Sequence, residues 1–108
     1  MRMILDEVRS LKERLNDIGT ALIKNDINAL SELIKESQNI TKVFTAFVGD
    51  APELNSMGLE LPIDIISEQL SRYIEGIKNR DMMLLTDNVN FELLDTLKVY
   101  EEILLQLS

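Results

Sequence analysis

The residues of this chain that can do chemistry are its carboxylates. The sequence has 19 Asp and Glu residues and neither histidine nor cysteine. Two pairs have the spacing that places both side chains on one face of a helix: Glu32 with Glu36, and Glu92 with Asp95. Four carboxylates on facing helices would supply the oxygen ligands that Mg²⁺ prefers, with water completing the octahedron. The alternative is that all four lie on solvated faces beside lysines.

The Glu92–Asp95 pair resembles the E-x-x-D motif of all-α nucleotide pyrophosphohydrolases. The resemblance implies a Mg²⁺-dependent nucleotide hydrolase in which Glu32, Glu36, Glu92 and Asp95 hold the metal. The first pair departs from the family pattern, because it reads E-x-x-x-E rather than E-x-x-E. A basic set that would hold phosphates is not evident.

The missing residue types exclude other chemistry. Without histidine the chain lacks the commonest general base, the commonest zinc ligand and the Glu-x-x-His motif of di-iron bundles. Without cysteine it has no thiolate nucleophile, no thiolate metal site and no disulfide. Neither a Gly-rich phosphate loop nor a G-x-S-x-G elbow is present. We therefore expect no cofactor and a function other than catalysis.

The net charge of −8 is distributed unevenly. Residues 1–48 carry seven basic and seven acidic side chains, whereas residues 49–108 carry four basic and twelve acidic ones. Such a surface repels phosphate groups, so we expect neither nucleic acid nor a membrane as a partner, and a basic protein would suit it better. Acidity that serves solubility alone is the alternative. With no apolar run long enough to span a bilayer and no signal-peptide core, the sequence predicts a cytoplasmic protein.

Apolar residues recur every three or four positions along most of the chain, which predicts an all-α fold. We expect a single domain, residues 1–108, in which two antiparallel helical hairpins form a four-helix bundle. The helices are predicted at about residues 3–24, 27–48, 63–79 and 82–107. The two halves look alike, which indicates either a duplicated hairpin or chance similarity between amphipathic hairpins.

Capping residues set these boundaries. Asp26 and Asp81 are candidate N-caps, Gly49 is a candidate C-cap, and Pro62 suits the first turn of the third helix. Residues 49–62 form the one long loop, which is either packed on the end of the bundle or functional. We favour packing, because the loop is rich in apolar residues: Leu54, Met57, Leu59 and Leu61.

Polar residues interrupt the apolar start of the last helix. They are Thr86, Asp87, Asn88 and Asn90. A buried Asp or Asn needs a hydrogen-bond partner, such as the hydroxyl of Tyr73. The group indicates a polar pocket for a ligand, a packing device or a solvent-facing stripe.

The segment ALIKNDINALSELIKE, residues 21–36, resembles the first hairpin of bacterial flagellar export chaperones. In those proteins a helix ends before an Asp, and a Leu-containing amphipathic helix follows. The resemblance covers about half of the chain, and it implies a short, acidic, cytoplasmic protein that holds the helix of a partner before export. The apolar loop and the acidic second half depart from that family, so no specific residue is carried over.

The last helix has apolar residues on more than one face, and methionines, which adapt easily to a partner, begin it. The candidate partner-binding residues are Met82, Met83, Ile103, Leu104, Leu105 and Leu107. They predict a non-enzymatic interaction module, chaperone- or adaptor-like, that binds a partner helix or self-associates as a homodimer. The alternatives are that these residues belong to the core, that the chain is the Mg²⁺-dependent hydrolase described above, or that it is a purely structural homo-oligomer.

Overall fold

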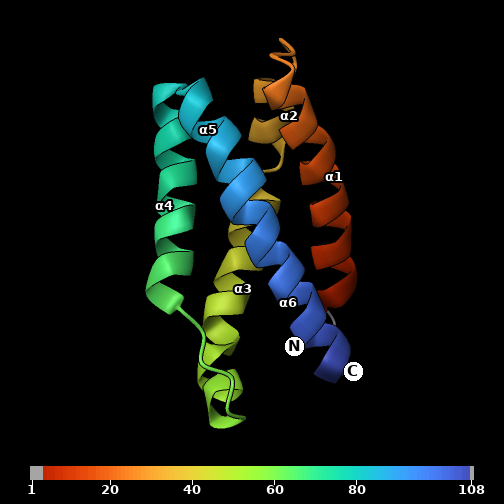
Figure 1. Ribbon diagram of the computed structural model, residues 1–108, viewed down its shortest axis with the longest axis vertical. Helices are drawn as coiled ribbons and strands as arrows, with labels where there is room; N and C mark the ends of the chain where they lie inside the picture. The colour runs from red at the N-terminus through yellow and green to blue at the C-terminus, as the bar shows by residue number, and fades with distance from the viewer. Residues whose placement is uncertain (1–3, 108) are drawn as a thin grey trace.

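The computed structural model describes residues 4–107, and the regular secondary structure in that range is helical throughout (Figure 1). The elements in chain order are α1 (Leu5–Ile23), α2 (Ala29–Lys35), α3 (Ser37–Ser56), α4 (Ile63–Asn79), α5 (Met82–Asn88), the π-helical segment η2 (Val89–Leu93) and α6 (Leu94–Leu107). The predicted all-α class is confirmed. The predicted start of the first helix at Met3 lies outside the described residues.

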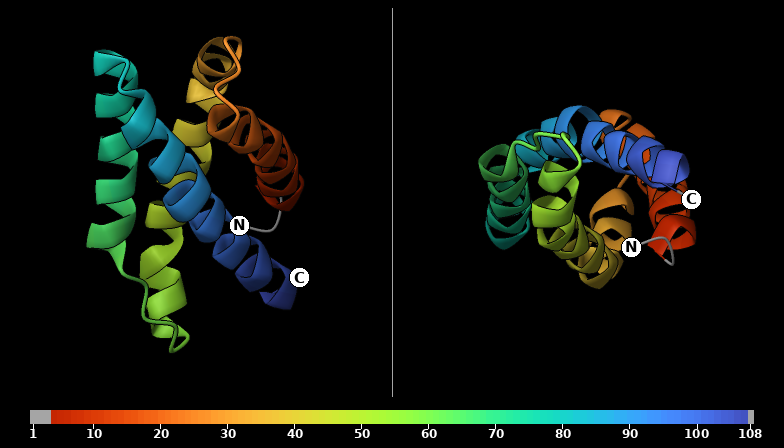
Figure 2. Two further views of the ribbon diagram at one scale, coloured as in Figure 1. Left: turned by 45° about the horizontal axis from the view of Figure 1, so that its top comes forward. Right: turned by 90° about the horizontal axis from the view of Figure 1, so that it is seen from below.

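In Figure 1, α1 and α4 run upward along the chain, while α2 with α3, and α5 with η2 and α6, run downward; Figure 2 shows the same arrangement from two other sides. α1 packs against α2, α3 and α6, while α4 packs against α3 and α5. The molecule is elongated, with principal extents of 43 × 24 × 19 Å. One apolar core runs along it, and its bulkiest members come from α3, α4 and α6: Phe44, Phe47, Tyr73 and Tyr100.

A stacked aromatic pair packs α3 against α6. The rings of Phe47 and Tyr100 stack with centroids 4.1 Å apart and an interplanar angle of 12°. The hydroxyl of Tyr100, which is fully buried, donates a hydrogen bond to Asp50 Oδ2 at 2.6 Å. The amphipathic tyrosine thus buries its ring and still satisfies its polar group, as a buried Tyr requires.

The predicted continuous helix over residues 27–48 is wrong, because α2 ends at Lys35 and α3 begins at Ser37. The carbonyl of Leu33 accepts from the N–H of Glu36 at 3.0 Å and from the hydroxyl of Tyr73 at 3.1 Å. The Ser37 hydroxyl lies 2.6 Å from the Tyr73 oxygen and donates to it. A side chain of α4 therefore holds the break, and the residues at the break are not themselves helix breakers.

The prediction that Gly49 ends a helix is also wrong, since α3 continues to Ser56 and contains Pro52. Proline has no N–H, so the carbonyl of Val48 loses its usual helical donor. Continuing the helix fully buries Ala51 and Leu54, which offsets that cost. The long loop is consequently reduced to residues 57–62.

The shortened loop packs in part on the core, as expected from its apolar residues. Leu59 and Leu61 are partly buried against the core cluster, whereas Met57 is 52% exposed. The N–H of Leu61 donates to Asn55 Oδ1 at 3.3 Å, which closes the loop on the end of α3.

Of the two aspartates predicted as helix N-caps, only Asp81 caps a helix. Asp81 Oδ1 accepts from the N–H of Leu84 at 3.1 Å and caps α5. The prediction that Asp26 caps the second helix is wrong, because Asn28 is the N-cap of α2 and no side chain caps it. Asp26 Oδ1 instead accepts from the N–H of Asn28 at 2.8 Å, within the turn that precedes α2. The boundaries of α4, at 63 and 79, and the start of the last helical run at 82 agree with the predictions.

We predict that Tyr73→Phe lowers the free energy of unfolding by about 1–3 kcal/mol, because it leaves the Leu33 carbonyl and the Ser37 hydroxyl without their buried partner. Urea unfolding at neutral pH measures the change. Ser37→Ala is the matched control, since it keeps the bond from Tyr73 to Leu33 and is expected to cost less. Equal costs would mean that Tyr73 does not hold the break.

Candidate functional site

The most unusual local structure is η2, the π-helical segment within the last helical run. Its N-terminal residue Val89 accepts a hydrogen bond from the N–H of Leu94, five residues later. Such wide turns are rare and occur frequently at functional sites. The segment is therefore the first place to look for one.

The spacing of buried residues explains the wide turn. Leu85, Val89, Leu93 and Leu97 are all buried and follow one another at intervals of four. In an α-helix each four-residue step advances about 40° beyond a full turn, so three steps would carry the stripe about 120° around the helix. A π turn takes up about one extra residue and returns the stripe to the core.

A buried amide lies at the start of this segment. Asn88 is 1% exposed, and its Nδ2 donates to the Gln69 carbonyl at 3.0 Å and to Glu92 Oε1 at 2.8 Å. Both partners are acceptors, so the nitrogen must face them, and Asn88 Oδ1 is left buried without a hydrogen bond. The predicted partner for such an amide, the Tyr73 hydroxyl, is instead bonded to Leu33.

An ion pair continues the polar contact between α4 and η2. Arg72 Nε lies 2.9 Å from Glu92 Oε1, and Arg72 Nη2 also contacts Glu92 Oε2. Glu68 adds a second carboxylate to Arg72 at 2.8 Å. The hydrogen bond from Arg72 lowers the pKa of Glu92 below its ordinary value of 4.5, and the bond from Asn88 lowers it further, although partial burial opposes the shift.

Asn90 ties the same segment to α1. Its Nδ2 donates to the Gly19 carbonyl at 3.1 Å and to the Thr86 carbonyl at 2.9 Å. Gly19 permits this approach, because an added Cβ would collide with Asn90 Oδ1 and lie 3.1 Å from its Cγ. Of the four polar residues predicted to interrupt this helix, Asn88 and Asn90 therefore act in packing.

The opposite face of η2 points to solvent and carries Phe91, which is 69% exposed. Exposed Asp87 and Asp95 lie four residues before and after it, and Val99, 47% exposed, follows after four more. Glu102 continues the row. We call the set Asp87, Phe91, Asp95, Val99 and Glu102 the Phe91 face. Residues 81–108 contain one basic residue, Lys98, and six acidic ones, so the surroundings of Phe91 are acidic.

The predicted partner-binding residues divide into two groups. Met82, Met83, Leu105 and Leu107 are exposed by 37%, 82%, 43% and 41%. Ile103 and Leu104 are 9% and 1% exposed and belong to the core, so the prediction that they contact a partner is wrong. Sequence reasoning missed Phe91; the signal was the regular four-residue spacing, which predicts an outer stripe parallel to the buried one.

The four carboxylates proposed as metal ligands are used elsewhere or stand apart. Glu36 pairs with Arg14 at 2.6 Å, Glu32 with Lys35 at 3.2 Å, and Glu92 with Arg72. Within residues 4–107 no group of three or more Asp, Glu, His or Cys side chains is arranged to hold a metal ion. The structure therefore does not bring Glu32, Glu36, Glu92 and Asp95 together.

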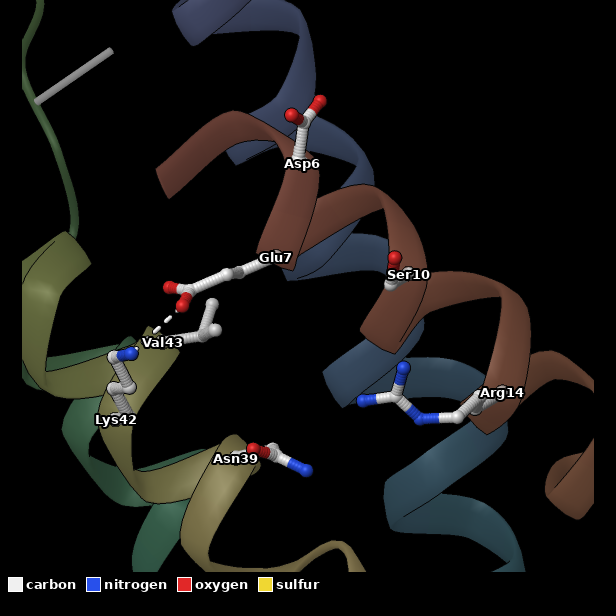
Figure 3. A pocket seen from close by; sticks show the side chains of 7 residues that line it. All are labelled: Asp6, Glu7, Ser10, Arg14, Asn39, Lys42 and Val43. Carbon is white, nitrogen blue, oxygen red and sulfur yellow. Dashed lines mark hydrogen bonds and ion pairs between the residues drawn. The ribbon is translucent and has the colours of Figure 1, made fainter. Parts of the chain in front are cut away.

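A pocket of about 200 Å³ lies between α1 and α3 (Figure 3). Glu7 and Lys42 reach toward each other across it and are bonded at 2.7 Å. Arg14, also on its wall, is bonded to Glu36 through two nitrogens, at 2.6 and 3.0 Å. Because each cation is already neutralised by a carboxylate, this pocket offers little to an anionic ligand.

We predict opposite effects for the same substitution at two glycines. Gly19→Ala displaces the Asn90 amide and lowers the free energy of unfolding by about 1–2 kcal/mol, the overpacking cost less the gain in helix propensity. Gly49→Ala raises it by about 0.5–1 kcal/mol, because nothing lies within 4 Å of the added Cβ. Thermal and urea unfolding of both variants test this. A stabilised Gly19→Ala protein would contradict the close contact with Asn90.

The lowered pKa of Glu92 predicts how stability depends on pH. A carboxyl with a depressed pKa in the folded state stabilises the fold above its unfolded value, and that contribution disappears as the pH falls through the folded value. We expect the free energy of unfolding to decline below about pH 4.5, and Glu92→Gln to make that decline shallower than Glu75→Gln does. Urea unfolding between pH 7 and 3 measures both slopes, and identical slopes would contradict the prediction.

Two further findings bear on function. No helix within the described part of the chain is both long and apolar enough to cross a membrane. Comparison of the chain with protein-family models, with curated proteins and with solved structures returned no match.

Proposed function

We propose that this protein is a non-enzymatic interaction module, chaperone- or adaptor-like, that binds a basic amphipathic helix of a partner protein along the Phe91 face. The observation that carries the proposal is a 69% exposed phenylalanine on a π turn, with a carboxylate four residues away on either side. Large aromatic side chains are typical anchors of protein interfaces.

Charge selects the class of partner. The Phe91 face has three carboxylates, and within residues 4–107 none of them forms an ion pair, whereas Glu92 pairs with Arg72 of α4 and Glu101 pairs with Arg9 of α1. Lys and Arg side chains of a partner can approach this face with favourable electrostatics. A nucleic acid or an anionic membrane would be repelled.

Spacing selects the shape of the partner. Apolar and acidic side chains alternate along the Phe91 face at intervals of three and four residues. A helix laid against it matches this repeat with apolar residues on one stripe and basic residues beside it. We propose further that the helical segments form a four-helix bundle whose role is to keep this face rigid. The general role is the one that the resemblance to flagellar export chaperones implies, holding a partner's helix.

The proposal is tested by replacing Phe91 with a photo-crosslinking amino acid and irradiating the cells that make the protein. We expect adducts on helical segments of a partner that are rich in Lys and Arg. Phe91→Ser is expected to weaken binding of the crosslinked segment, made as a synthetic peptide, by tenfold or more in calorimetry. Asp87→Asn with Asp95→Asn is expected to weaken it most at low salt.

The matched control places the same crosslinker at Met57, which is 52% exposed in the loop that follows the C-terminal end of α3. Equal adducts at both positions would show nonspecific contact. Adducts with a second copy of the chain, or with acidic segments, would overturn the proposed partner class. Unaltered peptide binding by Phe91→Ser would show that Phe91 is not the anchor.

A further inference from the structure

The two turns at one end of the molecule, the top in Figure 1, have the same construction. Each contains a non-glycine residue with positive φ, Asn25 at 57° and Arg80 at 51°. Each is closed by the N–H of the following aspartate: Asp26 donates to the Ala21 carbonyl at 3.0 Å, and Asp81 to the Gly76 carbonyl at 2.9 Å. This is the geometry of a Schellman cap. In the sequence an apolar residue follows each aspartate directly.

These turns carry exposed apolar side chains. Ile27, after the first aspartate, is 93% exposed, and Met82 and Met83, after the second, are 37% and 82% exposed. Ile23 adds a 60% exposed side chain from the end of α1. We call Ile23, Ile27, Met82 and Met83 the tip surface. It holds four of the twelve exposed large apolar side chains among the described residues.

A hollow of about 290 Å³ lies on the tip surface, and its lining includes the polar residues Asn25, Thr86 and Asp87. Its apolar wall comes from Leu22 and Ile23 on one side and from Met82 and Met83 on the other. A liquid-state water molecule occupies roughly 30 Å³, so the hollow has room for a branched aliphatic side chain. The tip therefore offers both a protruding isoleucine and an apolar recess.

The tip carries no net charge, unlike the acidic second half of the chain. Residues 22–28 and 78–87 together carry three cations, Lys24, Lys78 and Arg80, and three carboxylates, Asp26, Asp81 and Asp87. The whole net charge of −8 thus lies outside these two segments. Two copies of the chain that meet tip to tip therefore avoid the repulsion between like charges that an approach through the acidic second half would bring.

From these observations we infer that the tip surface binds a second copy of the chain about a two-fold axis. Ile27 of each protomer enters the hollow between Ile23 and Met83 of its partner. An interface of this kind is self-complementary, so it closes as a dimer rather than growing into a filament. Each tip brings three cations and three carboxylates to the interface, so opposite charges are available to pair across the axis. The interface shares Asp87 with the Phe91 face, because Asp87 lines the hollow, and it leaves Phe91 itself outside.

Sedimentation equilibrium tests the inference. The wild-type chain is expected to form dimers, and Ile27→Lys to raise the dimer dissociation constant by at least tenfold. Ile27 is almost fully exposed, so the substitution leaves the fold intact, as circular dichroism checks. Ile65→Lys is the matched control, because it makes the same change at a 53% exposed isoleucine at the opposite end of α4.

The absence of cysteine from the sequence permits a sharper test of the contact. Ile27→Cys and Met83→Cys proteins, mixed and mildly oxidised, are expected to give a mixed disulfide dimer far faster than Met57→Cys gives its own. A monomer at all concentrations would overturn the inference, and so would a dimer weakened equally by Ile65→Lys. A monomer that recruits a different protein through Ile27 would also overturn it. The crosslinking test at Phe91 stands apart from these results, because Phe91 does not line the hollow.

Discussion

The structure depends on one constraint, the need to keep Leu85, Val89, Leu93 and Leu97 on one face of a single helix. Their four-residue intervals do not fit an α-helix, and the π turn absorbs the difference. Three polar side chains connect that turn to the neighbouring helices. Asn88 reaches the backbone of α4, Glu92 pairs with Arg72, and Asn90 reaches the backbone of α1 at Gly19. These contacts fix the last helical run to α4 and α1 at the π turn. The positions of α5 and α6, which flank the turn, are set by the same contacts.

Sequence reasoning found the elements whose signals are local and missed those set by distant residues. The range of α4, the cap at Asp81 and the turn before it follow from proline, aspartate and apolar spacing nearby. The break between α2 and α3 has no local signal, because it is held by Tyr73 from 40 positions along the chain. Ala51 and Leu54 continue the three- to four-residue spacing of the buried side chains of α3 past Gly49. Gly49 and Pro52, however, favour the end of a helix at this point. At the candidate site the polar interruption was found, while Phe91 was overlooked because its helix was assumed to be regular.

Ion pairs explain why the acidity gathers on one side of the molecule. The cations of α1 are all turned toward neighbouring helices: Arg9 and Lys12 pair with Glu101 of α6, and Arg14 pairs with Glu36 at the break before α3. These contacts neutralise the inward carboxylates and tie the first half of the chain to the second. The outward carboxylates of the last run receive no such partner among the described residues. The uneven charge seen in the sequence thus becomes, in three dimensions, an acidic outer face on the helix that carries Phe91.

The inner and outer stripes of the last run have one cause. Asp87, Phe91, Asp95 and Val99 follow the same four-residue interval as the buried leucines and valine, displaced by two positions, which is about 200° around an α-helix. The extra residue that realigns the buried stripe therefore realigns the exposed one as well. In a regular α-helix Phe91 and Val99 would diverge by about 80°, and no single partner helix would contact both. The π turn that the core requires thus also aligns the exposed stripe. Asn88 is buried with an unsatisfied oxygen at the start of this turn, and the alignment of both stripes offsets that cost.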